Sequence, residues 1–124
     1  MSNICLLNFS ACQLKLKNYE SVVEHCSEVL QNDPENVKAF YRRGKAYSLM
    51  NSKLELAKKD FNRLMEIYIK NLKVEEDMPS LTSSLKINYK NEIKNLNAEL
   101  KLLEKKIKQQ NNQEKSFFSK MFMQ

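Results

Sequence analysis

The sequence repeats itself at an offset of about 34 residues, and this period restricts the folds that are open to the chain. Residues of similar character recur at that offset in two blocks, the second of which follows one inserted residue near position 51. The matched pairs are Leu6 with Phe40, Ser10 with Gly44, Cys12 with Ala46, Leu16 with Met50, Tyr19 with Leu54, Val22 with Ala57, Cys26 with Phe61 and Val29 with Leu64. The apolar spacing in each block is helical, so each unit is predicted to be a pair of helices.

The two units predict four helices over residues 3–16, 19–31, 37–50 and 53–70. The segment NDPEN, residues 32–36, carries a proline and helix-capping residue types between the units. One glycine and two prolines in 124 residues leave little turn chemistry for β-hairpins. We therefore predict an all-α fold with two stacked units, residues 3–36 and 37–71, in a first domain of residues 1–71.

The only glycine, Gly44, lies inside a predicted helix, where it costs about 1 kcal/mol relative to alanine. Its counterpart in the first unit is another small residue, Ser10. We predict that both lie where the two helices of a unit approach closely.

These features resemble the tetratricopeptide repeat family, whose units place large, small and aromatic residues at these positions and end in a proline. Pro34 fits that proline, whereas Ile69 stands at the corresponding place in the second unit and Arg43 replaces an apolar residue. The resemblance covers about residues 3–70. It implies a short right-handed solenoid whose first helices line a concave groove.

The C-terminal part begins with an acidic segment, LKVEEDMPS at residues 72–80, which we interpret as a loop. An apolar stripe then recurs at three- and four-residue steps, at Leu85, Tyr89, Ile93, Leu96, Leu100, Leu103 and Ile107. This stripe predicts a long helix within residues 81–124 whose first half caps the repeats. The rest could project into solvent or pair with a second copy as a coiled coil.

The hydrophobic tail, SFFSKMFMQ at residues 116–124, follows several lysines. A basic helix that ends in aromatic residues can bind calmodulin or lie on a membrane surface. The interpretation that we favour is that Phe118, Met121 and Phe122 continue the packing face of the helix.

A candidate binding site lies on the first helices of the two units. Lys38 and Arg42 are four residues apart on one helix, and Asn8 occupies in the first unit the position that Arg42 occupies in the second. Arginine binds a carboxylate bidentately, lysine adds a point charge, and asparagine can donate a hydrogen bond. Asn8, Lys38 and Arg42 could therefore clamp the end of a peptide, although the two cations could also be ordinary solvated charges.

This combination is similar to the carboxylate clamp in the repeat domain of large FK-binding immunophilins. The resemblance extends over LLNFSACQLKLKNYESVVEHCSEVL, KAFYRRGKAY and LAKKDF, and over KSFFSKMF near the C-terminus. It implies a co-chaperone that binds the acidic C-terminus of the ninety-kilodalton heat-shock chaperone, Met-Glu-Glu-Val-Asp, through Asn8, Lys38 and Arg42. It also implies that the chain is a C-terminal fragment, with a further repeat and a peptidyl-prolyl isomerase domain upstream.

The composition argues against nucleic-acid binding and against a membrane-spanning segment. The net charge of +6 is spread over both halves, which suits an acidic partner but lacks the dense basic stripe typical of nucleic-acid binding. No apolar run approaches the roughly 20 residues of a membrane span, and no signal peptide is apparent, so we expect the cytoplasm, with the nucleus as a second compartment. Cys5, Cys12 and Cys26 are expected to be buried, reduced thiols.

The sequence shows no arrangement of catalytic residues. His25 is the only histidine, and no Ser, Cys or carboxylate residues lie at a meaningful spacing from it. We expect no enzymatic activity in this chain, no cofactor and no metal. The acidic run Glu75, Glu76 and Asp77 lacks the pattern of a calcium loop. The alternative to the clamp is a scaffold that binds another protein through its apolar groove or associates with itself through the long helix.

Overall fold

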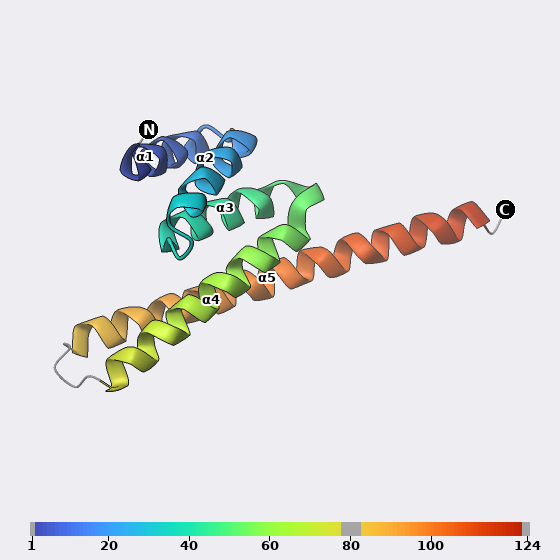
Figure 1. The fold of residues 1–124 in the computed structure, drawn as a ribbon. Coiled ribbons are helices and arrows are strands. Elements are labelled where there is room, and N and C mark those ends of the chain that lie inside the picture. Colours follow the sequence, from blue (N-terminus) through green and yellow to red (C-terminus); the bar gives the residue numbers. More distant parts are fainter. Residues whose placement is uncertain (1, 78–82, 123–124) are drawn as a thin grey trace.

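The computed structural model describes the backbone of residues 2–77 and 83–122, with the side chains of 74–87, 113–120 and 122 excepted. It contains α1 (Asn3–Lys15), α2 (Tyr19–Asn32), α3 (Val37–Leu49), the short 3-10 helix η1 (Asn51–Lys53), α4 (Leu54–Asp77) and α5 (Ser83–Phe122). The described part of the chain holds no strand, and the predicted all-α class is confirmed (Figure 1). The first three predicted helices end within one residue of the observed bounds.

The predicted acidic loop is wrong over residues 72–77, because α4 continues to Asp77. Leucine, lysine and glutamate are good helix formers, and the sequence has no breaker before Pro79. Proline disfavours the helical conformation at the residue before it, so Pro79 leaves the acidic residues up to Asp77 able to stay helical. The remainder of the predicted loop, residues 78–80, lies outside the described residues.

The helices stack in chain order, each packing on the next, and α1 also contacts α3. This is the arrangement of a helical solenoid, and the units are tetratricopeptide-like pairs (Figure 1). One apolar core lies among α1, α2 and α3 and the other among α3, α4 and α5. The first core consists of Leu6, Val22, Cys26, Val29, Ala39 and Ala46, and the second of Phe40, Leu54, Ala57, Phe61, Leu64, Ile67, Tyr68, Leu96 and Leu103.

The small residues of the repeat lie at close helix contacts, as predicted. A Cβ atom at Gly44 would stand 2.8 Å from Cε1 of Phe61, which is fully buried in α4. In the first unit, Ser10 takes the position of Gly44 and Cys26 takes the position of Phe61. Both Ser10 and Cys26 are fully buried. Burial raises the pKa of the Cys26 thiol, and its hydrogen bond with Ser10 partly offsets that rise. The two units thus fill the same space with a glycine and a phenylalanine, or with a serine and a cysteine.

The turn between α1 and α2 is set by Lys17, which has a left-handed φ of 62°. The Lys17 amide donates to the Leu14 carbonyl at 3.1 Å, and the Asn18 amide donates to the Gln13 carbonyl at 2.9 Å. These two bonds form a Schellman motif, in which a lysine takes the position usually held by glycine. The turn directs α2 back along α1.

Two of the three cysteines differ from the prediction. Cys26 is buried, but Cys5 and Cys12 are exposed. Their counterparts in the second unit, Ala39 and Ala46, are fully buried in the core that α2 shares. The same face of α1 is uncovered in the described structure, in which α2 and α3 are the helices that pack on α1.

The long helix α5 packs along α4, as its apolar stripe predicted. Leu96 and Leu103 are buried, and Tyr89, Ile93, Leu100 and Ile107 pack around them. The side chain of Leu85, also in the predicted stripe, lies outside those described. Gln110 donates to the Asn51 carbonyl at 2.6 Å, and beyond this contact α5 extends away from the repeats (Figure 1).

The tail of α5 does not continue the packing face at Met121, whose side chain is 57% exposed. The prediction that Met121 packs is therefore wrong, because α4 does not reach this part of α5 (Figure 1). The side chains of Phe118 and Phe122 lie outside those that the structure describes.

A pair of neighbouring leucines tests the capping role of α5. Leu103 is 2% exposed and Leu102 is 59% exposed. We expect Leu103→Ala to lower the free energy of unfolding by about 2–5 kcal/mol, because it leaves a cavity between α4 and α5. Leu102→Ala should change it by less than about 1 kcal/mol. Urea denaturation measures both, and equal effects would show that α5 does not stabilise the repeats.

Candidate functional site

A groove with a volume of about 510 Å³ opens between α1, α3 and α5. Its lining comes from four helices, and basic, aromatic, apolar and acidic side chains all contribute. The lining residues are Ala11, Leu14 and Lys15 of α1, Val37, Lys38, Tyr41 and Arg42 of α3, Tyr68 of α4 and Glu92 of α5. Its volume is within the range of small-molecule and peptide-end sites.

Lys38 and Arg42 both line this groove, one helical turn apart on α3. The Lys38 side chain is exposed and forms no ion pair with any side chain that the structure describes. Arg42 is half-buried, and its Nη1 donates to the Leu7 carbonyl at 2.7 Å. Since a guanidinium has five N–H donors, this bond fixes Arg42 against α1 and leaves others for a ligand.

The structure does not bring Asn8 into the groove lining. Asn8 is exposed on α1, and it precedes Ala11 and Lys15 by three and seven residues. This spacing places it on the same face of α1, about one turn beyond the lining residues. Asn8 therefore stands at the edge of the site, next to Leu7, which holds Arg42.

Sequence reasoning found only Lys38 and Arg42 among the lining residues, and the missed residues with charged or aromatic side chains are Lys15, Tyr41, Tyr68 and Glu92. Lys15 and Tyr41 could have been found from helical spacing, because they follow Asn8 and Lys38 on the same helix faces. Tyr68 and Glu92 come from α4 and α5, and only the packing of these helices brings them to the groove. Lys15 adds a third cation on the α1 side.

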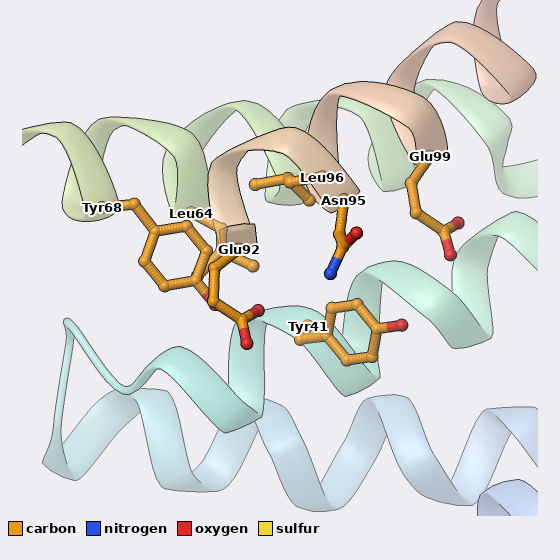
Figure 2. A pocket seen from close by; sticks show the side chains of 7 residues that line it. All are labelled: Tyr41, Leu64, Tyr68, Glu92, Asn95, Leu96 and Glu99. Carbon is orange, nitrogen blue, oxygen red and sulfur yellow. The ribbon is translucent and has the colours of Figure 1, made fainter. Parts of the chain in front are cut away.

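A smaller cavity of about 110 Å³ continues the groove between α3 and α5. It shares Tyr41, Tyr68 and Glu92 with the groove, and Figure 2 shows Glu92, Asn95 and Glu99 reaching from α5 toward α3. Burial, and then the negative charge of Glu92, raise the pKa of Tyr68 to about 12. Tyr68 is therefore protonated at neutral pH and carries no charge beside Glu92.

Arg43, next to Arg42, has a different role. Its Nε and Nη2 donate to Asp60 at 2.8 and 2.7 Å, and its Nη1 donates to Ser27 Oγ at 3.2 Å. The hydrogen bond with Asp60 raises the pKa of Arg43. Since Asp60 is buried, this bidentate pair joins α3 to α4, while Ser27 connects it to α2. Sequence analysis had only noted Arg43 as a departure from an apolar position.

Comparison with known proteins places this site in context. No model of a known protein family matches the chain. The chain is 32% identical over 89 residues to the peptidyl-prolyl cis-trans isomerase FKBP42 of Arabidopsis thaliana, which covers 72% of the chain and 24% of that protein. It is 37% and 35% identical over 65 residues to the isomerases FKBP4 of Homo sapiens and Bos taurus, over 52% of the chain and 14% of each protein.

FKBP42 and FKBP4 are thus homologues of this chain. The chain spans about a quarter of FKBP42 and less of FKBP4, so it corresponds to a minor part of those enzymes. We assign no catalytic activity to the chain itself. The described residues hold no group of His, Cys, Asp or Glu side chains placed to bind a metal ion, and none of their helices is long and apolar enough to cross a membrane.

The adjacent arginines provide a matched test of their two roles. Arg43→Met should lower the free energy of unfolding by about 2–4 kcal/mol, because it leaves the buried Asp60 carboxylate without its partner. Arg42→Met should cost about 1 kcal/mol, since it removes one hydrogen bond to a carbonyl. Chemical denaturation compares the two. Adding Asp60→Leu should recover much of the loss in Arg43→Met, and equal losses in the two single variants would contradict this assignment.

Proposed function

We propose that the chain is a tetratricopeptide-type interaction module of a co-chaperone, which binds the acidic C-terminal peptide of a partner through a carboxylate clamp. The observation that carries this proposal is the placement of Lys38 and Arg42 together in a groove of about 510 Å³. Lys15 lines the same groove and adds to its positive potential. Homology to FKBP42 and FKBP4 supports a module of this kind within an FKBP-type protein.

The chemistry of the groove fits a terminal carboxylate. Arg42 is held in place by the Leu7 carbonyl, so less side-chain freedom is lost when its remaining donors bind a ligand. Lys38 is exposed and supplies a second charge one turn away. Asn8, at the edge of the groove, would donate to a carbonyl or carboxylate of the peptide with a neutral, weaker hydrogen bond.

The proposed partner is a heat-shock chaperone of the ninety-kilodalton type, with a C-terminus ending Glu-Glu-Val-Asp. This choice rests on the resemblance to large immunophilins and on the cations of the groove. For the parent protein we propose a cytoplasmic peptidyl-prolyl isomerase, since the printed names of the relatives describe isomerases of which the chain matches a minor part.

We also propose a further helix pair that packs on the open face of α1. Cys5, Phe9 and Cys12 stand where the second unit has Ala39, Arg43 and Ala46, which pack toward α2. Phe9 is 40% exposed, and both cysteines are exposed. A preceding repeat would cover this face in the way that α2 covers α3.

The reading frame of the parent gene decides this point. We expect an upstream segment of about one repeat, with a basic residue and an asparagine on its first helix. In the longer protein, Cys5 and Cys12 should react with a thiol reagent more slowly than in the 124-residue chain. An upstream segment with no helical repeat, or unchanged reactivity of both thiols, would rule out this packing.

Peptide binding tests the clamp. We expect Lys38→Ala and Arg42→Ala each to weaken binding of a peptide ending Glu-Glu-Val-Asp by about 10- to 150-fold, because each removes a charge-assisted contact. Asn8→Ala should cost less. Lys59→Ala serves as a control, since Lys59 is exposed on α4 and lines neither cavity. Titration calorimetry measures the affinities of the four variants and of the unaltered chain.

The same peptide with a C-terminal amide separates the clamp from its alternative. A clamp requires the free carboxylate and weakens as salt is raised, whereas apolar docking or coiled-coil pairing tolerates both changes. Equal affinity for the acid and the amide would favour the scaffold interpretation and overturn the clamp.

A further inference from the structure

The helices α3 and α5 face each other across the groove in a constant register. They run in the same direction because α4 reverses the chain between them (Figure 1). Lys45 of α3 bonds Glu99 of α5 at 3.2 Å, an offset of 54 residues. Tyr41 and Asn95, which line the same small cavity, have the same offset (Figure 2). The register therefore places Glu92 opposite Lys38.

The two charge pairs differ in one respect. Lys45 and Glu99 form an ion pair that joins α3 to α5. Lys38 and Glu92 both line the open groove, and no ion pair joins them in the described structure. The groove thus has a basic wall on α1 and α3 and an acidic side chain on α5.

Glu92 is set among groups that suit a cation. Its side chain is exposed, and it lines the groove together with Tyr68, whose pKa its negative charge helps to raise. Tyr41 and Tyr68 line the groove beside it and offer aromatic rings (Figure 2). A carboxylate flanked by aromatic rings attracts lysine or arginine side chains through both charge and the ring quadrupole.

We propose that Glu92, with Tyr41 and Tyr68, forms a cation subsite that selects peptides carrying a lysine or arginine a few residues before the terminal carboxylate. This inference rests on the proposed carboxylate clamp and extends its ligands beyond the Glu-Glu-Val-Asp tail, which lacks the cation and should bind less tightly. The groove then binds peptide charges of both signs: α3 binds the terminal carboxylate of the peptide, and α5 binds its cationic side chain. A peptide with only acidic side chains binds through its terminus but is repelled by Glu92.

Three ten-residue peptides test the subsite on the full 124-residue chain. One ends Glu-Glu-Val-Asp, and the other two replace either glutamate by lysine. We expect at least one lysine peptide to bind about 3- to 10-fold more tightly than the acidic one, since a screened attraction replaces a screened repulsion. The preference should shrink as salt is raised.

Glu92→Gln is the decisive variant, because glutamine keeps the size and polarity of the side chain and removes the charge. It should reduce the lysine preference to less than about twofold, while binding still requires the free carboxylate. Glu104→Gln is the matched control, since Glu104 is exposed on α5 and lines neither cavity. It should keep the full preference.

The outcomes separate this inference from the function on which it rests. If the acid peptides bind, their amides do not, and Glu92→Gln leaves the preference unchanged, the clamp stands and the cation subsite is wrong. If Glu92→Gln raises affinity equally for all three peptides, Glu92 competes with the ligand for Lys38, and the subsite is again overturned. If the free carboxylate makes no difference, the clamp fails and the inference fails with it.

Discussion

The close approach of α3 to α4 at Gly44 is the constraint on which the rest of the structure depends. The ring of Phe61 occupies the space that a side chain at Gly44 would fill. Because the two helices meet there, Arg43 reaches the buried Asp60, and this pair fixes how α3 is rotated about its axis. That rotation points Lys38 and the neighbouring Arg42 into the groove. A helix that could turn freely would not hold two cations on one wall.

The repeat explains how much of this could be predicted from sequence. The repeat alignment predicted the helix pairs. It also predicted their close contact, because small residues, Ser10 and Gly44, recur at the same position of each unit. The same pattern placed Lys38 and Arg42 on one helix face. It could not separate the roles of Arg42 and Arg43, since a bidentate bond to Asp60 depends on where α4 lies.

The errors have a common physical origin in the ends of the repeat array. Cys5 and Cys12 were expected to be buried because their number and spacing fit neither a metal site nor a disulfide framework, but both are exposed on a face of α1 that has no helix on it in the described structure. The end of α4 was placed too early because acidic composition was taken for a loop, although helix formers continue to Asp77. A repeat pattern predicts the burial of a helix that has a repeat on each side. It does not predict burial at the ends of the array, where one neighbouring helix is missing or differs from the repeat.

The helix α5 is such an atypical neighbour, and it contributes what the repeats do not. It stands where the first helix of a third unit would stand, parallel to α3, but its sequence follows a capping stripe rather than the repeat (Figure 1). Its packing face is formed by the buried Leu96 and Leu103, whereas Glu92 is exposed and lies outside that core. Residues on this wall can therefore change ligand preference while the stability of the fold and the cations of α3 are retained. Differences in peptide selectivity among chains of this type should accordingly be sought on the capping helix.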